Sequence, residues 1–293
     1  MSQPRIAVLM SCHNRRNTTL SSLAAIYAQD IPGDIYLVDD GSSDGTSEAV
    51  RTSYPAVKIL QGDGNLFWGG GMQLAFSTAL KVGYDFYLWL NDDTKLAPNA
   101  LSLLLNTYRN LAAQDRANCI LAGSTQDPIT GELTYGGMVR LSPLRRLNFS
   151  LLSPTNQPQE CDTMCGNCVL IPHSVAKWVG TIDGDIFTHE FGDWDYGLRA
   201  RALGFSVWIA PGFIGSCSNN SVKGSWKDSS LPLIERFKKA DKLKGGLQPR
   251  VWMEFARRHA GVFWFIYWVS PYLRLVVASV FKSLEHPAVV TQK

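Results

Sequence analysis

Two pairs of neighbouring aspartates follow apolar runs that are typical of buried strands. Asp39 and Asp40 follow residues 35–38, and Asp92 and Asp93 follow residues 84–90. Divalent cations such as Mg²⁺ or Mn²⁺ prefer oxygen ligands, and one or two carboxylates are enough when a diphosphate supplies the others. We therefore predict a metal at Asp92 and Asp93. Taken alone, this pair is better explained as a turn at the end of a strand with solvated acids. The metal is favoured because other polar clusters are expected at the same edge of the sheet.

The Asp39-Asp40 pair has a different predicted ligand. A carboxylate at the end of a strand can accept a hydrogen bond from a pyrimidine N–H or from ribose hydroxyls. We predict nucleotide recognition for both aspartates, and capping of the following helix for Ser43 or Asp44.

A third acidic centre lies in residues 189–199. Asp193 is predicted to begin a helix, where the helix dipole favours the ionised carboxylate. An ionised carboxylate in a cleft can accept the proton of an attacking hydroxyl, so Asp193 is the candidate general base. Glu190 is the competing base, or an acceptor-binding residue together with His189 and Trp194. Asp195 and Arg199 are four residues apart and should form a structural ion pair.

The glycine-rich stretch 62–71 lies between a predicted strand and a helix predicted at 72–82. It is not the dinucleotide-binding fingerprint, because Phe67 occupies the third glycine position and the stretch does not follow the first strand. We predict a flexible run that covers the bound nucleotide or sugar, with Asn65 and Gly70 at the donor. A plain loop made of turns is the alternative.

Strands predicted at 6–10, 35–38, 57–60 and 84–90 alternate with helices, which indicates an α/β protein with a mostly parallel sheet. Such sheets bind ligands beyond the carboxyl ends of their strands, where residues 13–16, 39–40 and 92–93 all fall. Loops and short strands are expected over 124–158, a strand over 164–172, and helices over 174–179 and 193–203.

The composition excludes several classes of protein. The 293 residues carry a net charge of +3, which does not indicate nucleic-acid binding. Six cysteines in a chain of this size do not form a disulfide framework, and Cys161, Cys165 and Cys168 are better explained as buried thiols than as zinc ligands. No signal peptide is apparent, so a cytoplasmic location is expected.

Residues 260–273 are apolar and rich in aromatic side chains, with Arg257, Arg258, His259, Arg274 and Lys282 around them. The run is shorter than the ~20 residues that span a bilayer. We predict a segment lying in the inner face of the cytoplasmic membrane. The alternative is a helix packed on the domain or on a second subunit of a homo-oligomer. The expected domains are 1–230, with halves 1–123 and 124–230, and a helical extension 231–293.

Four motifs in order resemble the family 2 glycosyltransferases. They are Ser11-Cys12-His13-Asn14-Arg15, Val38-Asp39-Asp40-Gly41-Ser42, Asn91-Asp92-Asp93 and Gly192-Asp193-Trp194-Asp195, and the resemblance covers residues 6–218. Segments 64–72 and 127–137 further resemble bacterial enzymes of surface-polysaccharide synthesis, including rhamnosyltransferases.

The resemblance implies the GT-A fold and a role for each matching residue. Asp39 and Asp40 would recognise base and ribose, with Ser11, Asn14 and Arg15 on the first nucleotide-binding loop. Asp92 would contact the donor and the metal, Asp93 would be the direct ligand of Mn²⁺ or Mg²⁺, and Asp193 would be the base. Two departures stand out: Gly192 replaces a glutamate common in the family, and residues 215–219 lack a late histidine.

The implied function is inverting transfer of a sugar from dTDP-rhamnose or a UDP-hexose to a lipid-linked or polymeric glycan, as in O-antigen or capsule synthesis. A nucleotidyltransferase is the first alternative, but it normally has a G-x-G-T-R-like loop where this chain has Ser11 to Arg15. A carbohydrate-binding subunit with a degenerate site is the second.

Overall fold

The structure is a computed structural model that describes residues 3–114, 116, 118–219, 226, 228, 230–240 and 247–285. The chain divides into two compact units, Met1–Asn219 and Asn220–Lys293. Each unit is described by itself.

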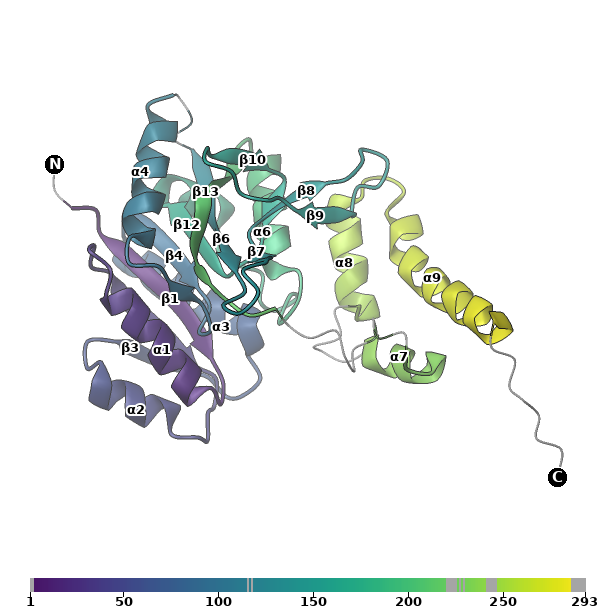
Figure 1. The fold of residues 1–293 in the computed structure, drawn as a ribbon, viewed down its shortest axis with the longest axis horizontal. Helices are drawn as coiled ribbons and strands as arrows, with labels where there is room; N and C mark the ends of the chain where they lie inside the picture. Colours follow the sequence, from purple (N-terminus) through teal and green to yellow (C-terminus); the bar gives the residue numbers. More distant parts are fainter. Residues whose placement is uncertain are drawn as a thin grey trace. The chain divides into compact units, whose positions relative to one another are not determined.

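A twisted sheet forms the centre of the first unit (Figure 1). In the described residues it has ten strands, and its main path runs β10-β13-β6-β12-β4-β1-β2-β3. The strands β1 to β4 pair in parallel, as predicted, whereas β12 is antiparallel to both of its neighbours. The strands of this sheet are β1 (Ile6–Cys12), β2 (Asp34–Asp39), β3 (Lys58–Gln61), β4 (Phe86–Leu90), β5 (Lys95–Leu96), β6 (Cys119–Gln126), β7 (Leu133–Tyr135), β10 (Gln159–Cys161), β12 (Cys168–Pro172) and β13 (Ser206–Ser216).

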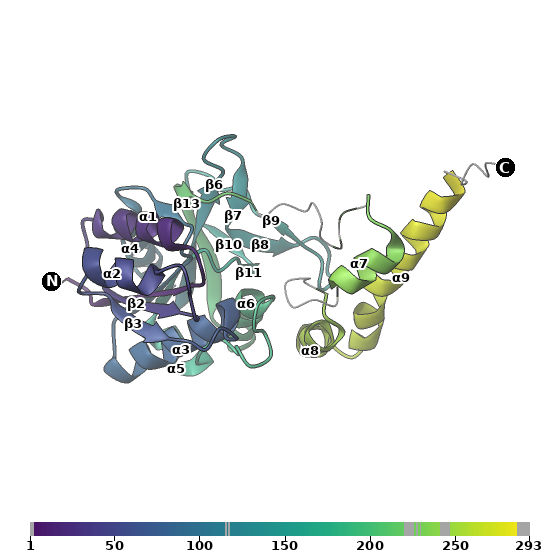
Figure 2. The ribbon, with the colours of Figure 1, turned by 90° about the horizontal axis from the view of Figure 1, so that it is seen from below.

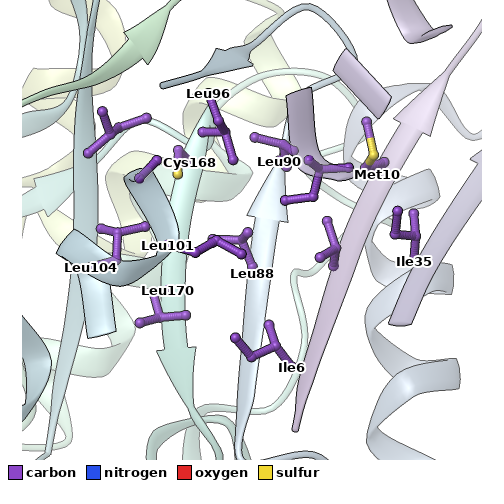
Figure 3. Close-up of a cluster of buried hydrophobic side chains, with 14 of the residues drawn as sticks. Ile6, Met10, Ile35, Leu88, Leu90, Leu96, Leu101, Leu104, Cys168 and Leu170 are labelled. Atoms are coloured by element: carbon purple, nitrogen blue, oxygen red, sulfur yellow. The ribbon is translucent and has the colours of Figure 1, made fainter. Parts of the chain in front are cut away.

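Helices cover both faces of this sheet because its strands are apolar on both sides (Figure 2). Alternate residues of β1 enter two separate cores, Ile6, Val8 and Met10 on one face and Ala7 and Leu9 on the other. The first core, shown in Figure 3, lies under α1 (Arg16–Tyr27), α2 (Thr46–Ser53) and α4 (Ala100–Ala112). The second lies under α3 (Phe67–Val82), α5 (His173–Val179) and α6 (Gly192–Ala202).

The strand predicted over 164–172 is confirmed for residues 168–172, but it does not run on from Met164, because the chain changes sheet between them. β11 (Thr163–Met164) pairs with β8 (Gly137–Arg140) in a small antiparallel sheet completed by β9 (Phe149–Leu151). Residues 165–167 then cross to the main sheet, where the chain resumes as β12. The crossing places the backbone of Gly166 beside the predicted base, which an unbroken strand would not do.

The glycine run 67–71 is helical, so the predicted flexible cover is wrong for these residues. α3 begins at Phe67, not at Met72, and the backbone N–H of Gly69 donates to the carbonyl of Thr188 at 2.6 Å. A Cβ on Gly69 would lie 1.9 Å from the carbonyl oxygen of Phe187, and one on Gly71 would lie 2.1 Å from Ser11 Oγ. These glycines therefore permit close packing and do not provide mobility.

The second unit contains α7 (Leu233–Ala240), α8 (Pro249–His259) and α9 (Trp264–Glu285). One face of α9 packs beside α8: the indole N–H of Trp252 donates to the carbonyl of Tyr267 at 3.2 Å, and that of Trp268 donates to the carbonyl of Pro249 at 3.1 Å. Within the described part of the chain, no helix combines the length and apolar character needed to cross a membrane.

The glycine packing yields a prediction with an internal control. Gly69→Ala should destabilise the fold by about 3 kcal/mol, because its methyl group meets backbone that cannot give way. Gly70→Ala should stay within about 1 kcal/mol of wild type, since the Leu66 side chain, 3.3 Å away, is partly exposed and the helix gains a better helix former. Urea unfolding of both variants measures the difference, and equal stabilities would contradict the packing role of Gly69.

Candidate active site

The two aspartates at the end of β2 are bound by the chain itself. Asp40 Oδ1 accepts the backbone N–H groups of Gly64 at 2.8 Å and Leu66 at 3.2 Å, and Oδ2 accepts that of Phe67 at 2.8 Å. Asp39 accepts the N–H of Ser42 at 3.0 Å and the hydroxyl of Ser47. Both residues are at most 2% exposed. In this structure Asp40 thus holds the start of α3, and recognition of base and ribose by the pair stays a prediction.

The loop after β1 is fastened to the turn after β2. Asn14, which has a positive φ of 51°, donates its backbone N–H to Ser42 Oγ at 2.8 Å and accepts the N–H of Ser43 at 2.7 Å. Ser11, 9% exposed, donates to the carbonyl of Phe67 at 3.4 Å. Ser11 and Asn14 therefore lie at the edge of the sheet where Asp39 and Asp40 end β2, as predicted.

Arg15 brings the predicted metal-binding aspartates together. Its guanidinium lies 3.1 Å from Asp92 Oδ1 and 2.8 Å from Asp93 Oδ2. Two carboxylates from one turn thus converge on a single cation, which is the arrangement a divalent metal would use. Among the described residues no group of three or more His, Cys, Asp or Glu side chains could hold a metal ion. Two adjacent carboxylates fit a cation that takes its remaining oxygen ligands from a diphosphate or water.

The surroundings of Asp92 disfavour its ionised form. Burial raises the pKa of Asp92 to about 7, with the nearby Asp93 charge adding to the rise and Arg15 opposing it. The Thr19 hydroxyl lies 3.4 Å from Asp92 Oδ2. The thiol of Cys217 lies 3.4 Å from Asp93 Oδ1 and accepts from the Asn167 amide. Cys217 thus occupies the region where the sequence lacks the late histidine.

Trp68 connects the aspartate turn to the predicted base, and sequence reasoning missed this role. Its indole N–H donates to Asn91 Oδ1 at 2.7 Å. A Cβ on Gly166 would lie 2.5 Å from the Trp68 ring and 3.3 Å from Asp193 Cβ, so ring and base flank the same glycine. The sequence signal is a tryptophan beside a glycine run, but it does not identify the residues that Trp68 meets.

Asp193 lies in the first turn of α6, as predicted. Its two oxygens accept the backbone N–H groups of Gly166 and Trp194, both at 2.8 Å. Burial raises the pKa of Asp193 to about 6, and the two N–H donors oppose the rise. The predicted pair of Asp195 with Arg199 is confirmed at 2.7 Å, and Arg199 also donates to the carbonyls of Val179 and Thr181.

The predicted acceptor-binding residues surround the start of α6. The Trp194 ring lies 5.3 Å from Phe149 of β9 and 5.9 Å from Phe191, whose φ of 67° is unusual for a bulky residue. His189 lies 6.3 Å from the Phe67 ring, and Glu190 is partly exposed on the same loop.

Both donor contacts predicted in the glycine run stay predictions, but the structure corrects the setting of one. Asn65 is exposed on the loop before α3. Gly70 lies within α3 against Leu66, because that part of the run is helix and not a mobile loop.

Comparisons with known proteins agree with this geometry. The family model described as "Glycosyl transferase family 2" matches residues 7–162, more than half of the chain. The N-acetylglucosaminyl-diphospho-decaprenol L-rhamnosyltransferase of Mycobacterium tuberculosis is 25% identical over 231 residues, which cover 71% of this chain and 72% of that protein.

Two solved structures share the fold. The mannosyltransferase PcManGT from Pyrobaculum calidifontis, in complex with GDP-Man and Mn²⁺, superposes with a TM-score of 0.56 at 16% identity, covering 99% of this chain and 77% of that one. GalNAc-T7 with UDP, GalNAc and Mn²⁺ gives a TM-score of 0.57 at 14% identity, covering 73% and 42%. These neighbours confirm the GT-A fold that the sequence predicts.

The environment of Asp193 predicts how sugar transfer depends on pH. A base must be ionised, and the pKa of Asp193 in the folded protein is raised, so kcat should be constant well above pH 6 and fall about tenfold per pH unit below it.

Asp193→Asn should lower kcat by roughly 10²-fold or more while the Kd of the donor stays nearly unchanged. Glu190→Gln should mainly raise the KM of the acceptor. Steady-state kinetics with a donor titration checks all three, and a dead Glu190 variant beside an active Asp193 variant would reverse the assignment.

Proposed function

Because the chain belongs to glycosyl transferase family 2, we propose that it transfers a sugar, with inversion, from a nucleotide-diphosphate donor to a lipid-linked glycan in the synthesis of a bacterial surface polysaccharide. The observation that carries this proposal is that Trp68 connects the turn of Asp92 and Asp93, through Asn91, with the partly buried carboxylate of Asp193, through Gly166. The donor is dTDP-rhamnose, or a UDP-hexose. The name of the mycobacterial relative, which specifies both rhamnosyl transfer and a diphospho-lipid acceptor, supports this choice.

The reaction needs one proton acceptor and stabilisation of one leaving group. An acceptor hydroxyl attacks the anomeric carbon, a C–O bond forms to the acceptor, and the C–O bond to the nucleoside diphosphate breaks. Asp193 takes the hydroxyl proton, held in place by the N–H groups of Gly166 and Trp194. A divalent cation at Asp92 and Asp93 would supply positive charge to the departing diphosphate. A single displacement from the opposite face inverts the configuration at the anomeric carbon.

The apolar face of α9 supports a location on the inner face of the cytoplasmic membrane. Its exposed side chains recur every three or four residues, which places them on one side of the helix: Phe265, Ile266, Val269, Leu273, Val276 and Val277. The exposed guanidinium groups of Arg250, Arg257 and Arg274 add positive charge to the same unit. An apolar stripe with basic residues suits the interface of an anionic leaflet.

The metal and the reaction are tested together. With dTDP-rhamnose and a GlcNAc-diphospho-lipid acceptor, purified protein should form a disaccharide in Mn²⁺ or Mg²⁺ and none in EDTA, because the aspartate pair needs a cation to bind the diphosphate. Asp93→Asn should lose both donor affinity and turnover. A panel of other UDP- and GDP-sugars tests the donor, and full activity in chelator would exclude metal dependence.

Membrane binding is tested by changing the exposed face of α9. The full chain should sediment with phosphatidylglycerol–phosphatidylcholine vesicles, and Ile266→Glu with Leu273→Glu should lower the partition coefficient by at least about tenfold, because charged side chains resist burial in the leaflet. The matched control is Val82→Glu with Ile129→Glu, two exposed apolar residues of the first unit. If wild type stays in the supernatant and elutes as a dimer, this face is a subunit interface.

A further inference from the structure

The β8–β9 hairpin, residues 140–149, has exposed basic and apolar side chains to which the proposed reaction assigns no role. Its two strands run side by side at the small sheet (Figures 1 and 2). The connection contains Leu141, Leu144, Arg145 and Arg146. No acidic residue occurs between Glu132 and Glu160, so the three arginines of this segment give it a clear positive charge.

The tip of the hairpin is a formed turn. The N–H of Leu141 donates to the carbonyl of Asn148 at 3.0 Å, and two further backbone hydrogen bonds, Arg145 to Ser142 and Asn148 to Arg145, close the turn at 3.1 and 2.9 Å. Arg140 Nε donates to the carbonyl of Arg146 at 2.7 Å. The backbone is therefore held while the side chains of Arg145 and Arg146 remain exposed.

The hairpin presents apolar and basic side chains together. Leu144 is 86% exposed and Leu141 is 59% exposed. Exposed leucines beside arginines in one short turn suit a ligand that is both anionic and lipid-like, since guanidinium groups bind phosphate through paired hydrogen bonds.

A chain of ring contacts joins this hairpin to the base. The Arg140 guanidinium lies 5.4 Å from the centre of the Phe149 ring, and that ring lies 5.3 Å from Trp194, which directly follows Asp193. Moving away from Asp193, the rings of Trp194 and Phe149 come first, and the exposed arginines and leucines of the turn follow together.

We propose that the β8–β9 hairpin binds the acceptor through its lipid diphosphate. The reacting sugar lies against Trp194 and Phe149 beside Asp193, the diphosphate lies on Arg145 and Arg146, and the first isoprene units contact Leu141 and Leu144. Aromatic rings next to the base, followed by a turn that is both basic and apolar, suit a sugar-diphospho-prenol whose non-reducing sugar lies at Asp193. The inference rests on the proposed function for the class of acceptor, but the hairpin's affinity for a prenyl diphosphate can be measured without any transfer.

The experiment uses the full chain and farnesyl diphosphate as the probe, with farnesol and inorganic pyrophosphate as the two partial ligands. Isothermal titration calorimetry at constant ionic strength should give farnesyl diphosphate the lowest Kd. Arg145→Ala with Arg146→Ala should raise that Kd at least about tenfold, because charge-assisted bonds to phosphate are lost. Leu141→Ser with Leu144→Ser should weaken farnesyl diphosphate but leave pyrophosphate unchanged.

Matched controls lie elsewhere on the first unit. Arg51→Ala with Arg109→Ala removes two other exposed arginines, and Ile129→Ser removes a side chain that is 91% exposed. Both controls should bind farnesyl diphosphate as wild type does. All substituted residues are exposed, so the melting temperatures of the variants should remain close to that of wild type.

Several results would overturn the proposal. An unchanged Kd in the arginine variant, or equal weakening in the controls, would place the ligand elsewhere. A further contrary result would be binding to phosphatidylglycerol vesicles that needs Arg145 and Arg146 but is not reduced by farnesyl diphosphate added in phosphatidylcholine vesicles. The hairpin would then be a surface that binds lipid headgroups. If no donor supports transfer while farnesyl diphosphate still needs Arg145 and Arg146, the proposed function fails and the hairpin site stands.

Discussion

The hydrogen bonding of one buried carboxylate, Asp40, fixes most of the site. A carboxylate that accepts three backbone N–H groups is strongly held, and here those groups belong to the turn and first residue of α3. Because the start of α3 is fixed, Trp68 reaches Asn91 and Gly166, and Gly69 reaches the carbonyl of Thr188. The end of β2 thereby positions the aspartate turn after β4 and the loop that leads to Asp193. Asp40 also satisfies N–H donors at a helix start, a place that would otherwise attract a phosphate.

Burial of Asp92 imposes a second constraint, because a buried carboxylate without a cation is costly. Removing one partner of a buried ion pair typically destabilises a protein by about 3–5 kcal/mol. Arg15 meets this need with one guanidinium nitrogen on each aspartate. A divalent cation on Asp93 would compete with that contact, and the donor diphosphate is the anion to which a released guanidinium would turn.

The sequence predicts this architecture well where local patterns decide and poorly where distant segments meet. Apolar runs followed by acids give β2 and β4, and the start of α6, one residue before Asp193, follows from the local pattern of residue types. The prediction of a mobile glycine run was wrong because glycine permits both mobility and close packing. Here residues 187–188, more than a hundred positions away, pack against Gly69, and the local sequence does not reveal that contact. The same holds for Arg15, whose partners Asp92 and Asp93 are distant in sequence (Asp93 lies 78 residues further along), and for Trp68. The break in the strand predicted at 164–172 depends on the small sheet, which residues 137–151 complete.

Burial affects Asp92 and Asp193 in the same way, although different roles are proposed for the two carboxyl groups. Burial raises the pKa of both carboxyl groups, to about 7 and about 6. Asp92 has a guanidinium beside it, and this full positive charge opposes the effect of burial on its pKa. Asp193 has only backbone N–H donors, which fix its orientation and oppose the effect of burial without supplying a full charge. Its carboxylate is therefore ionised near neutral pH yet basic enough to hold a proton, which is the balance that a general base requires. Since Gly192 replaces the glutamate that is common beside this aspartate in the family, no second carboxylate adjacent in sequence shares that proton, and the environment of Asp193 alone has to set its basicity.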